Sequence, residues 1–350
     1  MAAKKRVTLL DVAKRAGVSR STASNLVRGV GRASEQTRDR VFKAMEELGY
    51  VYNRAAGSLR TSSSRTVGVV ITNIHRAHFG ELLVGMEQAF TEAGYTLFVV
   101  STLDRLERQE RAISSLREHN VDGLVVVPAT GSDEKLIGTL EQWGVPSVFV
   151  SRRIPGIDHP YVGIDNEHGG YLAARHLIEH GCAAFVYIGS RAGVSIHLER
   201  VSGVRRAIEE GRGGVELTVV EGETTSATGY QVVRDLVRRG VSFDAVIGHG
   251  DHVALGAQRA LYDLGFPAPG EPGSVRVIGY DGIDAASYWT PALTTLAVNA
   301  NSLGRQAAFS ILQAIDTGEP VASALPRPSL IVRESCGSHV GEAPYEVAPS

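Results

Sequence analysis

The pattern of apolar and polar residues at the amino end of the chain predicts three short helices. Apolar residues recur at helical spacing in three runs, and each run is followed by a glycine. The predicted helices run from Leu9 to about Ala16, from about Arg20 to Arg28, and from about Glu35 to Leu48. Side chains suited to capping a helix stand before each one: Thr8 (with Asp11 to complete a capping box), Ser19 and Ser34.

The middle helix has two chemically different faces. At about 100° per residue, its polar side chains fall within an arc of about 140°, and they are Arg20, Ser21, Ser24, Asn25 and Arg28. Apolar side chains occupy the opposite side, where they would pack on the other two helices. Arg, Ser and Asn are the side chains that reach base edges and phosphates in a DNA major groove, so the pattern predicts a helix-turn-helix. The alternative is a three-helix bundle that binds protein or nothing.

Strands and helices alternate along the rest of the chain. Short apolar runs predict strands at 67–71, 95–100, 123–127, 145–150, 184–189, 215–220, 245–248 and 275–280. Helical periodicity fills the intervals at 79–93, 106–118, 134–143, 167–180, 198–209, 227–239 and 252–264. This alternation predicts an α/β fold with mostly parallel sheets covered by helices, arranged as two similar lobes. Ligands of such folds bind beyond the carboxyl ends of the strands, here in a cleft between the lobes.

Charge divides the chain in the same way as the hydrophobic pattern. Residues 1–60 carry 13 Lys and Arg against five Asp and Glu, whereas the remainder carries 23 against 33. A small basic domain joined to an acidic body favours a polyanion such as DNA as one partner. The 43% hydrophobic and 21% charged content is typical of a globular protein, and the absence of an apolar run of membrane-spanning length or a signal-peptide core predicts a cytoplasmic protein without membrane contact. Cys182 and Cys336 are expected to be buried, reduced thiols.

Two ordered segments of the basic region resemble the lactose-repressor (LacI/GalR) family of bacterial transcription regulators. They are residues 8–24, which include Ala16-Gly17-Val18-Ser19, and residues 48–56, which begin Leu48-Gly49-Tyr50. The resemblance implies that Arg20 and Ser21 begin a recognition helix that specifies bases. The full set of DNA-binding residues that we expect is Thr8, Leu9, Ser19, Arg20, Ser21, Thr22, Ser24, Asn25, Arg28, Arg32, Ser34, Thr37, Tyr50, Asn53, Ala56 and Leu59.

Residues 53–64 form a segment that the resemblance identifies as a hinge. Its first eight residues, 53–60, contain Gly57 and cannot hold a stable helix alone in water, and a plain flexible linker is the alternative. In the family such a segment becomes helical on DNA, and Leu59 matches the apolar wedge that opens a base step in the minor groove. We expect Leu59→Ala to weaken operator binding without unfolding the body, and undiminished affinity in a mobility-shift titration would refute the wedge.

The resemblance extends through the body to about Ser338 and includes Arg200-Val201-Ser202-Gly203 and Gly279-Tyr280-Asp281. It implies a fold like that of periplasmic sugar-binding proteins. The domains would be a headpiece (1–52), the hinge (53–64), an effector-binding and dimerisation core (65–338) and a flexible tail (339–350). Within the core, lobe one would comprise 65–164 and 297–323, and lobe two 165–296 and 324–338. The tail shows no leucine heptads, so no helix that joins dimers into tetramers is expected.

Arg200 and Asp281 match the family's effector-binding arginine and aspartate, whose fork and carboxylate suit the hydroxyls or ring atoms of a polar ligand. The resemblance also brings His78, Phe79, Ser151 and Gly250 to the effector site. Phe79 has a second interpretation as a core residue at the start of a helix. A sugar or sugar-like effector is favoured over a purine.

These observations predict a DNA-binding transcription regulator without enzymatic activity. We expect a repressor that binds a palindromic operator as a homodimer under the control of a small molecule, with no cofactor and no metal. Two alternatives lack DNA contact, namely a ligand-binding module and a carbohydrate-modifying enzyme, but no catalytic signature supports the latter. The run His249-Gly250-Asp251-His252 suggests a metal site, but Asp251 is better explained as the N-cap of the next helix.

Overall fold

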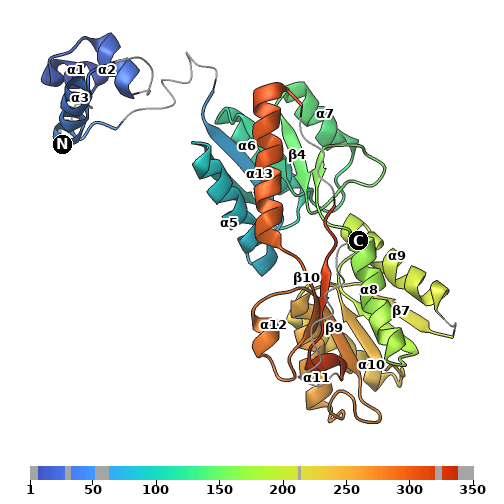
Figure 1. The fold of residues 1–350 in the computed structure, drawn as a ribbon. Coiled ribbons are helices and arrows are strands. Elements are labelled where there is room, and N and C mark those ends of the chain that lie inside the picture. The colour runs from blue at the N-terminus through green and yellow to red at the C-terminus, as the bar shows by residue number, and fades with distance from the viewer. Residues whose placement is uncertain (1–6, 28–32, 52–62, 212–213, 320–324, 338–350) are drawn as a thin grey trace, which may run out of the picture. The chain divides into compact units, whose positions relative to one another are not determined.

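The computed structural model describes residues 7–27, 33–51, 63–211, 214–319 and 325–337 (Figure 1). These residues fall into two compact units that divide between Ser64 and Arg65. In the part of the chain that the structure describes, no helix is both long and apolar enough to cross a membrane.

The amino-terminal unit contains the three predicted helices. They are α1 (Leu9–Ala16), α2 (Arg20–Val27) and α3 (Glu35–Leu48), and their described bounds agree with the predicted ones. One small core holds them together, formed by Val12, Ala13, Ala16, Ala23, Leu26, Val41 and Ala44. Burial of so few side chains contributes little stabilisation in a unit of this size. Hydrogen bonds that cap the helix ends are therefore important for its stability.

The helix ends of this unit carry the predicted caps. The Thr8 hydroxyl accepts a hydrogen bond from Asp11 N, and the Asp11 carboxylate accepts one from Thr8 N at 2.9 Å, which completes the capping box. The Ser34 hydroxyl accepts a hydrogen bond from Thr37 N at 3.3 Å. Gly17 (φ 66°) and Gly49 (φ 62°) adopt the left-handed conformation that ends α1 and α3, a backbone geometry that glycine adopts at little cost.

The first sheet of the body is parallel, with strand order β2-β1-β3-β4-β5. Its strands are β1 (Thr66–Ile71), β2 (Thr96–Ser101), β3 (Gly123–Val126), β4 (Ser147–Val150) and β5 (Tyr161–Val162). The helices that connect them are α5 (Ala77–Glu92), α6 (Leu106–Glu118) and α7 (Glu134–Trp143). Every residue of β1 is buried, because helices cover both faces of the sheet, and this explains why the strand is apolar throughout instead of alternating.

The second sheet has strand order β11-β10-β9-β8-β6-β7 and is parallel except for β11, which pairs with β10 in the antiparallel direction. Its strands are β6 (Ala184–Ile188), β7 (Glu216–Val220), β8 (Ala245–Gly248), β9 (Arg276–Asp281), β10 (Thr294–Ala297) and β11 (Ser329–Ile331). The helices of this lobe are α8 (Asn166–Glu179), α9 (Ser195–Glu210), α10 (Ser226–Arg238), α11 (Asp251–Asp263) and the short α12 (Ala285–Tyr288), with a 3₁₀ turn η1 (Glu334–Cys336). The two lobes are therefore each doubly wound, as predicted.

Between β10 and β11 the chain leaves the second sheet and adds α13 (Ala300–Thr317) to the first lobe, where it packs against α5, β3 and β4 (Figure 1). Glycines allow α5 and α13 to approach closely, because a Cβ at Gly85 would overlap the carbonyl oxygen of Asn301 and a Cβ at Gly304 would overlap that of Leu82. The chain thus passes between the lobes three times. Two lobes joined only by such connecting segments can change the angle between them by a hinge motion.

Candidate functional site

The exposed face of α2 is polar, as predicted. Arg20, Ser21 and Asn25 are exposed, whereas Ala23 and Leu26 are buried against α1 and α3. The Arg20 guanidinium makes no hydrogen bond or ion pair with any residue in the described ranges. A cationic fork that none of the described residues neutralises remains available to a phosphate or to a guanine edge.

Hydroxyl groups gather at the amino ends of α2 and α3. The Ser19 hydroxyl accepts a hydrogen bond from Thr22 N at 3.0 Å and lies 2.8 Å from both the Ser21 and Thr22 hydroxyl oxygens. Ser34 and Thr37 form a similar pair at 2.8 Å. A helix amino end carries backbone N–H groups without helical partners and a partial positive charge, so both places suit a DNA phosphate.

The other expected DNA-binding positions are less uniform. Leu9 and Tyr50 pack partly against the headpiece core, and Ser24 is half-buried. The side chain of Leu9 is therefore a packing group, and its backbone N–H at the start of α1 is the atom suited to a phosphate. Five expected positions lie outside the described residues: Arg28, Arg32, Asn53, Ala56 and Leu59.

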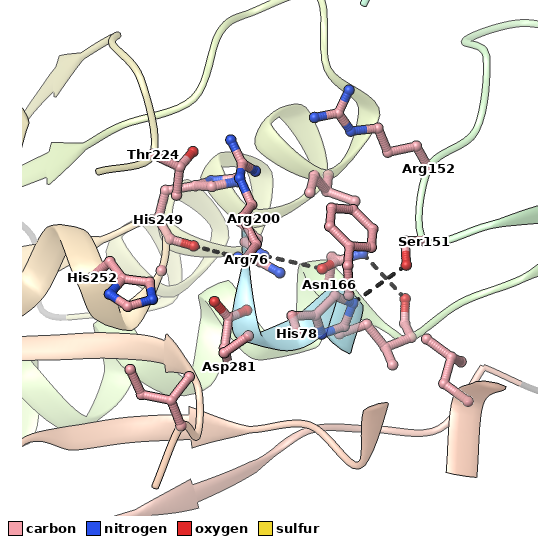
Figure 2. A pocket seen from close by; sticks show the side chains of 17 residues that line it. Arg76, His78, Ser151, Arg152, Asn166, Arg200, Thr224, His249, His252 and Asp281 are labelled. Atoms are coloured by element: carbon pink, nitrogen blue, oxygen red, sulfur yellow. Dashed lines mark hydrogen bonds between the residues drawn. The ribbon is translucent and has the colours of Figure 1, made fainter. Parts of the chain in front are cut away.

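In the body, the six predicted effector-site residues lie on the wall of one cavity between the lobes (Figure 2). They are His78, Phe79, Ser151, Arg200, Gly250 and Asp281, and the cavity measures about 750 Å³ with its open mouth. The remaining wall residues are Arg76, Ala77, Arg152, Ile164, Asn166, Ile196, Thr224, His249, His252, Ile283 and Leu303. The carboxyl ends of β1, β4, β8 and β9 all lie at this cavity, so the residues at or just after these strand ends line it.

Arg200 is held rigidly at the back of this cavity. Its Nε donates to Asn166 Oδ1 at 3.0 Å and its Nη1 donates to the carbonyl oxygen of His249 at 2.5 Å. Its guanidinium also lies 3.3 Å from the centre of the Tyr280 ring. Burial raises the pKa of Tyr280 to about 12, so the ring remains a neutral platform for the cation. Arg200 is therefore oriented before any ligand arrives.

Asp281 ends β9 in a backbone conformation that few side chains adopt, with φ of 112°. No side chain or backbone N–H in the described part of the chain donates a hydrogen bond to its carboxylate. Gly250 makes room for it, because a Cβ there would lie 3.0 Å from Asp281 Oδ2. A strained residue whose carboxylate accepts no hydrogen bond from the described residues is typical of a ligand-binding position.

Asp251 contacts the loop after Asp281 and does not cap α11, so the prediction of an N-cap at this residue is wrong. The N-cap is Gly250, and Asp251 lies one residue inside the helix. From there its carboxylate accepts from the Thr295 hydroxyl at 2.5 Å and from Ile283 N at 2.8 Å. The capping interpretation failed because an Asp at the start of a helix can use its oxygens on a neighbouring loop when the fold brings one close.

Arg76 is the principal wall residue that sequence reasoning missed. It precedes α5 and has no hydrogen bond or ion pair from its guanidinium to the residues that the structure describes. Burial lowers the pKa of Arg76, Arg152 lowers it further and Asp281 opposes this, but an arginine remains charged. The only local signal was its place just after the first strand, two residues before His78.

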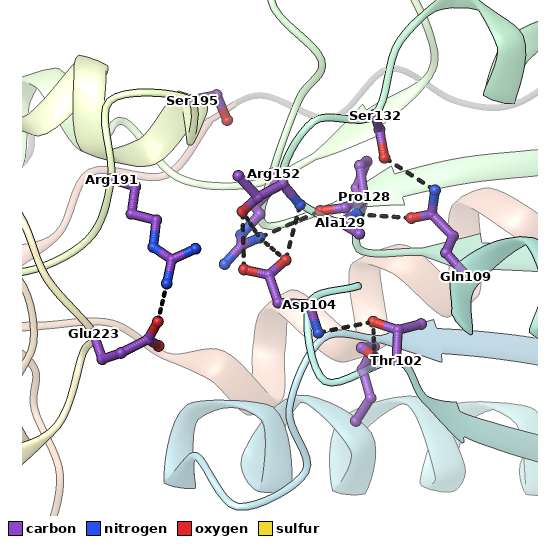
Figure 3. A network of polar contacts seen from close by, with 12 residues as sticks. Thr102, Asp104, Gln109, Pro128, Ala129, Ser132, Arg152, Arg191, Ser195 and Glu223 are labelled. Carbon is purple, nitrogen blue, oxygen red and sulfur yellow. Dashed lines mark hydrogen bonds and ion pairs between the residues drawn. The ribbon is translucent and has the colours of Figure 1, made fainter. Parts of the chain in front are cut away.

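Arg152, by contrast, has an ion-pair partner within lobe one (Figure 3). Its Nη1 forms an ion pair with Asp104 Oδ1 at 2.8 Å, and the Asp104 carboxylate also accepts from the Thr130 backbone and hydroxyl at 2.9 Å. Burial of the Asp104 carboxyl is outweighed by Arg152 and these hydrogen bonds, so its pKa is held below the usual range. Arg76 is consequently the cation at this end of the cavity that has no paired anion among the described residues.

Burial favours the neutral form of two histidines on the cavity wall. Burial is the main cause that lowers the pKa of His78 and the pKa of His249. His78 Nε2 lies 3.4 Å from the Ser151 hydroxyl, and His249 Nδ1 lies 2.7 Å from the Tyr187 hydroxyl. Their rings can donate and accept hydrogen bonds without adding charge. Phe79 is a core residue that is 4% exposed, and it also lines the cavity.

Comparison with known proteins agrees with this arrangement. Residues 8–53 match the model of the lacI family of bacterial regulatory proteins, and residues 64–334 match that of periplasmic binding proteins and the sugar-binding domain of the LacI family. The HTH-type transcriptional repressor PurR of Escherichia coli O139:H28 is 32% identical over 97% of this chain and 98% of its own. The HTH-type transcriptional regulator AscG of Escherichia coli K12 is 30% identical over 89% of this chain and 93% of its own.

Solved structures give the same result. A lac repressor dimer bound to operator and an anti-inducer superposes with a TM-score of 0.85 at 25% identity, covering 95% of this chain and 99% of the other. The complex of the transcriptional regulator CelR with cellobiose gives 0.70 at 31% identity over 94% and 100% of the two chains. The chain therefore belongs to the LacI family of bacterial regulatory proteins and is a DNA-binding transcriptional regulator.

Proposed function

We propose that this regulator represses transcription by binding a two-fold symmetric operator as a homodimer, with α2 of each subunit in a major groove. The observation that carries this proposal is the exposed polar face of α2, on which Arg20 has no partner among the described residues. Two copies of such a helix in a symmetric dimer contact two half-sites, so the operator is expected to be a palindrome.

The subunits are proposed to associate through the body. Strand β2 is an edge strand on which Phe98 is 38% and Val99 is 40% exposed, and Val84 on α5 is 46% exposed. Exposed apolar side chains on a strand edge are a liability unless another chain covers them. A second copy is the occupant that fits, since the lac repressor of similar fold is a dimer in its operator complex. Phe98→Ser is expected to shift the protein toward monomer in sedimentation velocity.

An effector in the cavity would contact both lobes at once. Arg76, His78 and Ser151 belong to the first lobe, whereas Arg200 and Asp281 belong to the second. A ligand that joins these groups favours one angle between the lobes over another, and its differential affinity shifts the population of DNA-competent dimers. The hinge predicted at residues 53–64 would transmit this shift to the headpieces.

We infer that the effector is a sugar or sugar-like molecule that also carries an acidic group. Asp281 offers two oxygens to adjacent hydroxyls, Arg200 and Asn166 lie behind them, and Arg76 is a cation without an ion-pair partner in the described chain. A half-buried cation without a paired anion is stabilised by an anionic group on a ligand. A purine is less favoured because the Phe79 ring is 4% exposed and meets His78 edge-on, which leaves little of its face for stacking.

A thermal-shift screen of neutral sugars, sugar acids, sugar phosphates and nucleobases tests this inference. We expect the largest stabilisation from an acidic sugar, with the shift lost in Arg76→Ala and Asp281→Asn. Arg175→Ala is the control, because this arginine pairs with Glu179 on the surface of α8. Stabilisation by a nucleobase, or by a neutral sugar with full response in Arg76→Ala, would contradict it.

A further inference from the structure

A second group of ligand-type side chains lies in lobe two, away from the effector cavity. His176 and His180 are four residues apart at the end of α8, and Cys336 is the last residue of η1. One nitrogen of each imidazole and the Cys336 sulfur all lie within 4.8 Å of one another. Among the described residues, this is the one place where three such groups meet in this way.

The histidine pair is arranged as metal-binding histidines are. The two ring centroids are 4.2 Å apart, on one face of α8. His180 Nδ1 donates to the carbonyl oxygen of His176 at 2.8 Å, since a carbonyl can only accept, and this leaves the lone pair on Nε2. A carbonyl that fixes the tautomer by accepting from the other ring nitrogen is a regular feature of imidazole ligands.

His176 provides an independent observation. Its Nε2 is buried and has no hydrogen-bond partner in the described part of the chain. A buried polar atom without a partner is uncommon in folded proteins and requires an explanation. A metal ion that accepts the Nε2 lone pair would supply the missing partner.

We propose that His176, His180 and Cys336 bind a single Zn²⁺ ion that clips the carboxyl-terminal segment to α8. Two imidazoles and one thiolate are ligands that zinc prefers, and water would complete a tetrahedral set. With Zn–N of about 2.0 Å and Zn–S of about 2.3 Å, ligand atoms lie about 3.3–3.6 Å apart, so the side chains must move inward by about an ångström. The two imidazoles are half-buried and give the ion a path from solvent, whereas Cys336 is fully buried.

The zinc ion would bind to η1, a segment that already forms hydrogen bonds with the second sheet and the loop before β10. The Ser335 hydroxyl donates to the carbonyl oxygen of Val277 at 2.5 Å and accepts from Thr294 N at 2.8 Å. Glu334 accepts from Ala292 N at 2.8 Å. The metal would add a link from η1 to the helix whose first residue, Asn166, orients Arg200.

Cobalt titration of the tag-free full chain, after removal of metal with a chelator, tests this proposal. Co²⁺ reports thiolate ligation by a sulfur-to-metal absorption band, and competition with Zn²⁺ then gives the zinc affinity. We expect one ion per chain, loss of the band in Cys336→Ser, and an affinity at least about tenfold weaker in His176→Gln and His180→Gln. The control is Cys182→Ser, which removes the other buried thiol and should retain the band.

Thermal unfolding separates loss of the site from loss of the fold. Each variant should unfold cooperatively without metal, and added Zn²⁺ should raise the melting temperature of the parent and of Cys182→Ser but not of Cys336→Ser. The proposal is overturned if the parent binds no ion, if the band persists in Cys336→Ser, or if it disappears in Cys182→Ser.

Discussion

The Asp251 carboxylate accepts a hydrogen bond from Ile283 N at 2.8 Å and thereby orders the turn after Asp281, a residue that lines the cavity between the lobes. Its other oxygen accepts from the Thr295 hydroxyl on β10. Two carboxyls consequently lie close together at the carboxyl edge of the second sheet. The Asp251 carboxyl forms hydrogen bonds within the protein, whereas the Asp281 carboxyl lines the cavity. The short distance between the two carboxyls affects the stability of the fold.

We predict that Asp251 makes the stability of the body depend on pH. Burial, followed by the charge of Asp281, raises the pKa of Asp251 from 3.8 to about 7. Between these values the folded chain binds more protons than the unfolded one. The contribution of Asp251 to the free energy of unfolding is therefore fully present below about pH 4 and is lost as the pH rises toward 7.

Urea unfolding of the parent and of Asp251→Asn across this pH range checks the prediction. The amide introduced by this substitution can accept from Ile283 and donate to Thr295, but it does not titrate. The difference in unfolding free energy, parent minus variant, should fall steadily as the pH rises. Buried histidines such as His249 act in the opposite sense, because their lowered pKa costs stability as the pH falls, but they are common to both proteins. A difference that does not vary with pH would exclude this role.

A second prediction concerns the contact between α8 and α9. A Cβ at Gly170 would overlap the backbone carbonyl oxygen of Arg200. We expect Gly170→Ala to lower the free energy of unfolding by about 1–3 kcal/mol or more and to weaken effector binding, since Arg200 must move with α9.

Gly138→Ala is the matched control for this substitution. Gly138 lies inside α7, and no heavy atom of a neighbouring group lies within 4 Å of the position that a Cβ would take, so the alanine should stabilise the helix by about 0.5–1 kcal/mol. If both variants changed stability in the same direction, the close approach of α8 and α9 would not be the cause.

The dependence of DNA affinity on salt is a third prediction. Binding that is dominated by phosphates gives a logarithmic slope of about −0.9 for each phosphate neutralised. We expect a steep loss of operator affinity between low and moderate salt in fluorescence anisotropy titrations. A nearly flat response would contradict a phosphate-dominated interface at the amino ends of α2 and α3.

Helix caps and hydrophobic periodicity were sufficient to predict the three headpiece helices and the alternation of strands and helices in the body. Thr8, Ser34 and Gly49 are next to the helices that they cap, so the signal is contiguous in the sequence. Strands β10 and β11 carry weak patterns because they are short, and α13 contributes to a lobe whose other elements lie far back in the chain. Their placement depends on tertiary packing, which periodicity does not encode.

In the cavity, too, some residues could be predicted from local sequence and others depend on contacts between distant segments. The motifs around Arg200 and Asp281 were enough to propose them as wall residues of the cavity, whereas Arg76 lacks an ion-pair partner among the described residues because Asp104 pairs with Arg152. Asp104 and Arg152 are 48 residues apart, and nothing in either local sequence indicates the pair. The role of Asp251 was misassigned for a similar reason, since its partners Ile283 and Thr295 come from distant segments.

Selection of duplexes from a random DNA pool by the protein tests whether α2 recognises a specific DNA sequence. We expect enrichment of a two-fold symmetric sequence. Arg20→Ala should weaken binding to it greatly, whereas Arg15→Ala should leave binding unchanged because the Arg15 side chain pairs with Glu47. Failure to enrich any sequence, or recovery of the same site with equal affinity by Arg20→Ala, would contradict a regulator that reads DNA through the exposed face of α2.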